Sequence, residues 1–262
     1  MLRILFILTI FVSAFLLFQI QPMLSKELLP RFGGGASVWS ASLFFYQTVL
    51  LLGYFYAHFL SRYPLKKQIV IHISLVVLAS LISLNKFQVN FTLTPNWSVM
   101  VNLLNQIGLV FMLLSATSVL MQRWYIERGE NTVPYHWYSV SNLGSLLALI
   151  SYPIIFEVFF SLQQQKNYWQ IGLLIYCMLL ICLAYKLLSM SSKKNKSPLP
   201  LTKKMSKKPN VLWIILSATS SIMLIATTQM ISTNIPPMPL VWVVPLAIYL
   251  VTFSYTFASK NN

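Results

Sequence analysis

The chain has 262 residues, of which 57% are hydrophobic and only 9% are charged. A water-soluble domain of this length carries roughly a quarter charged residues, so the composition excludes an ordinary soluble globular domain. Only four residues are acidic, all of them glutamates. With so few acids, the chain has almost no residues from which to build a catalytic site of paired carboxylates, and we expect no enzyme activity.

The formal net charge is +15. The cations lie in loops between apolar segments, where a positive excess marks the cytoplasmic side of a membrane. We therefore expect anionic lipid headgroups, and not nucleic acid, to supply the opposite charge.

A helix needs about 20 mostly apolar residues to cross the hydrocarbon core. The first candidate follows Arg3 and resembles a signal peptide, but no cleavage site of good form follows it, so we expect it to be retained. Pro30 and the glycines at 33–35 predict a tight turn within a loop over 25–38. The predicted spans of this all-α polytopic bundle are 2–22, 39–60, 69–84, 98–121, 137–160, 168–188, 211–231 and 240–257.

A basic linker divides these spans into six and two. Residues 186–210 hold eight of the nineteen Lys and Arg side chains and no acid. The expected organisation is a six-helix bundle over 1–188, a cytoplasmic linker over 189–210, and two further helices with a short tail over 211–262. Fifteen of the nineteen cations fall on one side of the predicted topology. Both termini are then cytoplasmic, with anionic headgroups at the linker.

Several segments resemble one family. They are residues 15–24 (FLLFQIQPML), 29–35 (LPRFGGG), 53–58 (GYFYAH), 135–146 (YHWYSVSNLGSL) and 239–253 (PLVWVVPLAIYLVTF). Together they are similar to the membrane portion of the fused major-facilitator/spermidine-synthase-like proteins of bacteria. The resemblance implies a major-facilitator-like first half in the bacterial inner membrane.

In that family a soluble synthase-like domain follows the membrane portion. Here no glycine-rich nucleotide loop and no Asp is present, so spermidine synthesis is not carried over. Two hypotheses remain: a transporter of a small polar or cationic solute, or a membrane scaffold or subunit. In either case a second copy or a partner chain is a candidate to supply the remaining helices or a synthase-like domain.

Polar side chains inside a membrane normally face a bundle interior or a cavity. Six amides fall in the outer half of the predicted spans. If they converge, they form an outward-facing pocket that binds a polar or cationic solute; the alternative is hydrogen bonding between helices. These candidates are Gln19, Gln47, Asn102, Asn105, Gln106 and Gln229.

A second polar set lies toward the inner side, where close helix packing is the favoured reading. It comprises Ser139, Ser141, Asn142, Ser145 and the repeated LSATS sequence at 114–118 and 216–220.

Two charged residues are candidates for gating or ion coupling. Glu157 is the acid placed well within a span, and its alternative role is an interfacial position near Lys166. Arg123 lies one helical turn before Glu127, which also suits a helix-end ion pair. The three histidines lack metal-ligand spacing, so we expect no metal site and no cofactor.

Overall fold

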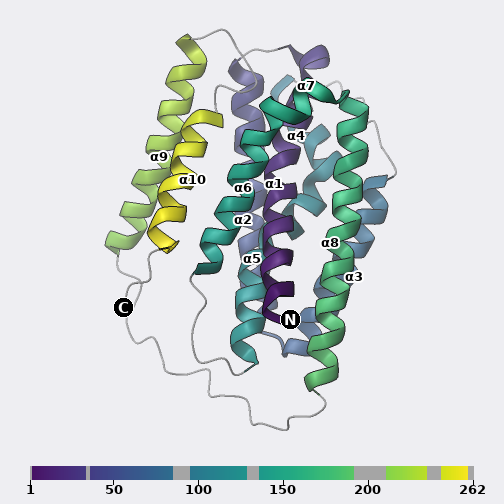
Figure 1. The fold of residues 1–262 in the computed structure, drawn as a ribbon. Helices are drawn as coiled ribbons and strands as arrows, with labels where there is room; N and C mark the ends of the chain where they lie inside the picture. Colours follow the sequence, from purple (N-terminus) through teal and green to yellow (C-terminus); the bar gives the residue numbers. More distant parts are fainter. Residues whose placement is uncertain are drawn as a thin grey trace.

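The computed structural model describes residues 2–33, 36–84, 95–128, 136–191, 211–234 and 243–258, and throughout these ranges the regular structure is helical. Figure 1 shows the helices running side by side along one direction. Seven helical stretches in the described ranges are long and apolar enough to cross a membrane, and Val244–Thr256 is a shorter apolar helix. The prediction of an all-α polytopic bundle of about eight spans is confirmed.

The first three spans are single helices, α1 (Leu2–Phe32), α2 (Ala36–Leu60) and α3 (Leu65–Leu84). The fourth consists of α4 (Pro95–Leu103), η1 (Leu104–Gly108) and α5 (Leu109–Glu127). The fifth consists of α6 (His136–Ser151), η2 (Tyr152–Phe156) and α7 (Glu157–Phe159). The last three are α8 (Leu162–Ser191), α9 (Val211–Asn234) and α10 (Val243–Ala258).

The first helix is longer than predicted, because it continues through Pro22 and Pro30 to Phe32 and replaces most of the loop expected over 25–38. Its added turns are packed: Met23, Leu24 and Leu28 are buried. The turn itself is at Gly33, with φ +76° and its N–H donated to the Leu29 carbonyl 2.9 Å away. A left-handed glycine is a common helix terminator.

Two short π-helical segments interrupt the fourth and fifth spans. In η2 the cause is Pro153, which has no N–H to donate. The wider π turn re-forms the ladder beyond it, and the Glu157 N–H donates to the Tyr152 carbonyl. At the corner that follows, the Gln165 side chain donates to the carbonyls of Phe156 and Phe160 at 3.0 and 2.9 Å.

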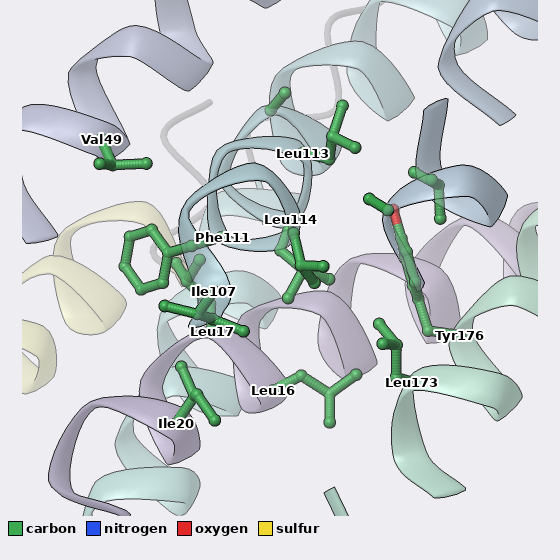
Figure 2. Packing of buried hydrophobic residues seen from close by; sticks show 14 of the residues in the cluster. Leu16, Leu17, Ile20, Val49, Ile107, Phe111, Leu113, Leu114, Leu173 and Tyr176 are labelled. Atoms are coloured by element: carbon green, nitrogen blue, oxygen red, sulfur yellow. The ribbon is translucent and has the colours of Figure 1, made fainter. Parts of the chain in front are cut away.

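The core is centred on α1 and α5. Leu113, Leu114 and Phe111 of α5 are buried and pack toward residues of α1, α2 and α8, as Figure 2 shows. The Tyr176 hydroxyl of α8 forms a 2.7 Å hydrogen bond with the Thr117 hydroxyl of α5. This packing joins the first six spans into one body.

Helices α9 and α10 lie together at one side of this body (Figure 1). Helix α10 packs along α6, where Leu250 and Leu149 are buried together and the Ser139 hydroxyl donates to the Ser254 carbonyl at 3.2 Å. Helix α9 touches α10 and α2 only lightly. The linker predicted over 189–210 lies almost wholly outside the described residues, which resume at Val211.

Candidate functional site

A cavity of about 570 Å³ lies between the six-span body and the α9–α10 pair. Its walls come from α1, α2, α5 and α6 on one side and from α9 and α10 on the other. On α2 the lining runs from Leu43 to Tyr54, which is roughly 16 Å at 1.5 Å per residue. A volume in this range suits a small-molecule ligand.

Four polar groups on this wall make no hydrogen bond to any described residue. They are the side-chain amides of Gln21, Gln47 and Asn142 and the buried hydroxyl of Ser118. Each comes from a different helix: α1, α2, α6 and α5. Of the four, the Ser118 hydroxyl is the one that is buried without a partner among the described residues, whereas Gln47 is exposed and Asn142 is half-buried. The three amides and the hydroxyl give this wall the donors and acceptors that a polar ligand needs.

Other hydroxyls of the cavity wall donate hydrogen bonds within their own helices. Ser115 donates to the Met112 carbonyl at 2.8 Å, and Ser145 donates to the Ser141 carbonyl at 3.0 Å. Their oxygen lone pairs remain able to accept hydrogen bonds. The cavity therefore offers both amide donors and hydroxyl acceptors.

The cavity is also aromatic and uncharged. Tyr54, Tyr138 and Tyr249 line it. None of its described lining residues is Asp, Glu, Lys, Arg or His. A strongly charged solute would be desolvated here without a side-chain counter-ion, which is unfavourable.

The six predicted amides do not share one pocket. Gln47 and Gln229 line a second cavity of about 390 Å³ between α2 and α9, where the Ser40 hydroxyl donates to Gln229 Oε1 at 3.2 Å. Gln47 lines the central cavity as well. Asn105 and Gln106 lie on η1, at a separate pocket of about 80 Å³.

The other two amides face other surroundings. The Asn102 side chain donates to the Ser98 carbonyl at 2.7 Å, which closes a bond within its own helix. Gln19 is buried, and its Oε1 has no partner among the described residues. Neither residue lines one of these three cavities.

Glu157 and Lys166 each form an ion pair with a residue of α1. Glu157 pairs with Lys26 at 3.1 Å, and Lys166 pairs with Glu27 at 2.6 Å. The cause is the longer α1, which carries Lys26 and Glu27 up to α7 and α8. These two ion pairs tie one end of α1 to its neighbours.

Arg123 forms the expected helix-end ion pair, with its Nε 2.6 Å from Glu127 Oε1. Glu127 also accepts hydrogen bonds from Gln68 of α3 at 3.3 Å. Arg123 and Glu157 both lie away from the central cavity lining. A gating role for either stays a prediction.

The inner serine set divides between wall and packing. The Ser139 hydroxyl donates a hydrogen bond to the Ser254 carbonyl of α10. The cavity is lined by the others, Ser115, Ser118, Ser141, Asn142 and Ser145. The first LSATS copy therefore contributes to the wall. In α9 the lining serine is Ser221, one residue beyond the second copy.

Gln21 is the lining amide that the sequence prediction missed. Its signal is helical spacing: Ser13, Leu17 and Gln21 recur every four residues and share one face of α1. Gln19, two residues earlier, lies on another face.

Within the described ranges, no group of three or more His, Cys, Asp or Glu residues is placed to hold a metal ion. Comparisons with protein-family models, curated proteins and solved structures find no match for the chain. The fold and the apolar helices define the class: this is a multi-span α-helical membrane protein with an internal polar cavity.

Proposed function

We propose that this chain is a transporter-like membrane protein that binds a small, uncharged, hydrogen-bonding solute or chemical group in its central cavity. The observation that carries the proposal is the convergence of Gln21, Gln47, Ser118 and Asn142, from four helices, on one cavity, where the Ser118 hydroxyl is buried without a partner among the described residues. Amides and hydroxyls recognise hydroxyl- or amide-bearing solutes without a charge partner. A cation has only ring faces and oxygen lone pairs to bind here, so a neutral solute fits the lining better.

The resemblance to the membrane portion of the fused major-facilitator/spermidine-synthase-like family supports the same reading. In such transporters a six-helix half is followed by a cytoplasmic loop and further helices. Here the cavity lies between the first six spans and α9–α10. The proposal also places the chain in a bacterial inner membrane, with both termini in the cytoplasm. The basic linker then binds anionic lipid headgroups.

The test compares Gln21→Leu with Gln19→Leu. Both glutamines are buried, at 5% and 4% exposure, on the same helix, but only Gln21 lines the cavity. Purified protein in proteoliposomes is screened for uptake of radiolabelled polyols, sugars and small amides, with thermal stabilisation as a second readout. Gln21→Leu and Asn142→Leu should each weaken binding about tenfold, which corresponds to losing one hydrogen bond of roughly 1.4 kcal/mol.

Gln19→Leu should leave solute binding unchanged. If the wild-type protein shows no concentration-dependent uptake or stabilisation with any member of the panel, the proposal is wrong. It is also wrong if the Gln19 and Gln21 variants behave alike.

One observation favours the second candidate, a non-transporting membrane subunit. Only 6% of the apolar window of α9 is buried, against 61% for Trp97–Glu127. Large side chains such as Ile214, Ile222 and Met223 are exposed along α9. A subunit role predicts a stoichiometric partner after extraction in mild detergent; a monodisperse single-chain monomer contradicts it.

A further inference from the structure

The central cavity and the α2–α9 cavity adjoin one another. Five residues belong to the walls of both: Leu43, Gln47, Leu224, Ile225 and Leu246. Gln21, Asn142 and the lining serines Ser13, Ser115, Ser118, Ser141, Ser145 and Ser221 belong to the central part alone, whereas five of the nine residues that line the α2–α9 part are Leu, Ile or Phe. We call the latter the α2–α9 groove, defined by Ser40, Phe44, Thr228, Gln229 and the five shared residues.

The α2–α9 groove opens on the outer surface of the helices. Its lining residues Phe44 and Ile225 are 62% and 54% exposed. Both belong to helices long and apolar enough to span a membrane, so this surface faces hydrocarbon. The groove is therefore a side opening between the polar cavity and the bilayer.

The chemistry of the two parts differs in a way that fits one kind of molecule. Amide and hydroxyl groups in the cavity suit a polar head, and the apolar groove suits a chain that leaves it sideways. No described lining residue of either part carries a charge. A phosphate or carboxylate head would thus be buried without a counter-ion, at high cost.

We infer that the ligand is an amphiphile, with an uncharged, hydrogen-bonding head in the central cavity and a hydrocarbon chain in the α2–α9 groove. The inference rests on the proposed function and adds the substrate class to it. The route of entry is lateral, from the bilayer between α2 and α9.

The probe is 1-oleoylglycerol carrying a photoactivatable diazirine on its chain, added to the full chain in nanodiscs. Crosslinked peptides should map to the segments around Phe44 and Ile225, and labelling should saturate. Unlabelled 1-oleoylglycerol should compete at least tenfold better than free glycerol, which lacks the chain, or oleate, whose head is charged.

The matched variants are Ile225→Trp and Ile222→Trp on α9. Both side chains are exposed, at 54% and 62%, but only Ile225 lines the groove. A Trp at 225 fills the groove and should weaken probe binding at least tenfold, whereas a Trp at 222 should leave it unchanged.

Three outcomes would overturn the inference. Equal labelling of the two variants would mean ordinary lipid contact. Competition by glycerol as strong as by 1-oleoylglycerol would mean that the chain contributes nothing, while the proposed polar site would stand. Efficient copy-to-copy disulfide formation by Ile225→Cys, with Cys177 and Cys182 replaced by Ala, would mean that a second protein copy covers the groove.

Discussion

At the scale of single residues, the best-defined polar contact in the core is made by Trp124. Its indole is fully buried, and Nε1 donates to Gln68 Oε1 at 3.0 Å. The Gln68 amide in turn donates to the Tyr63 carbonyl at 2.7 Å and to Glu127. The network joins α3 to α5 through the fully buried side chains of Gln68 and Trp124.

Trp124→Phe should lower the free energy of unfolding by about 1–3 kcal/mol, because it leaves the buried Gln68 oxygen without this donor. Equilibrium unfolding in mixed detergent micelles measures the change. Trp97→Phe is the control, since Trp97 is 61% exposed and should change stability by less than about 0.5 kcal/mol. Equal losses in both variants would show that the indole bond contributes nothing.

At the residue scale, the sequence identifies the residue types but not the direction in which each side chain points. Amides in the spans are exceptional enough to be noticed, and Gln47 does line the central cavity. Gln19 and Gln21 cannot be distinguished by composition. Their roles differ because a two-residue step turns a helix by about 200°, and only the neighbouring helices show which face borders the cavity.

At the scale of elements, the approach of α2 to α5 depends on Gly53. A Cβ at this position would lie 2.5 Å from the Met112 carbonyl oxygen and would collide with the Ser115 side chain. Small residues allow such close helix contact in membranes. This contact positions Ser115, a serine of the cavity wall.

Gly53→Ala should destabilise the protein by about 1–3 kcal/mol, because backbone atoms of α5 must move to admit the methyl group. Gly172→Ala is the matched control. There the nearest atom is Leu16 Cδ2 at 2.8 Å, the flexible end of a side chain. Unfolding in detergent should show a clear loss for the first variant and little for the second; the reverse order would refute this account of the α2–α5 contact.

At the scale of the whole molecule, the basic segments set the expected orientation. Under the positive-inside rule the linker and both chain ends face the cytoplasm, while the α7–α8 corner faces outward. Gln163, at that corner, is exposed. Ser197 belongs to the linker, outside the described residues.

With Cys177 and Cys182 replaced by Ala, Gln163→Cys should react with a membrane-impermeant maleimide added to intact cells. Ser197→Cys should react only after the cells are opened. Labelling is read by gel shift. Reaction of Ser197→Cys in intact cells would invert the orientation.

The membrane spans were determined by the sequence alone. Hydrocarbon excludes unpaired backbone and charge, so long apolar runs must become helices wherever their neighbours lie. This local rule located all eight segments, and it failed for the end of α1. There Pro30 predicted a loop, but packing of Leu28 and the ion pairs of Lys26 and Glu27 extend the helix.

Only the tertiary structure decided which polar groups meet. Three features depend on the rotation of each helix about its own axis. They are the ion pairs Lys26–Glu157 and Glu27–Lys166, the division of the six amides among different surroundings, and the shared lining of the central cavity and the α2–α9 groove. That rotation is fixed by contacts between residues far apart in the chain, such as Gly53 with Ser115. Apolar composition is nearly the same on every face of these helices, so it cannot specify the rotation.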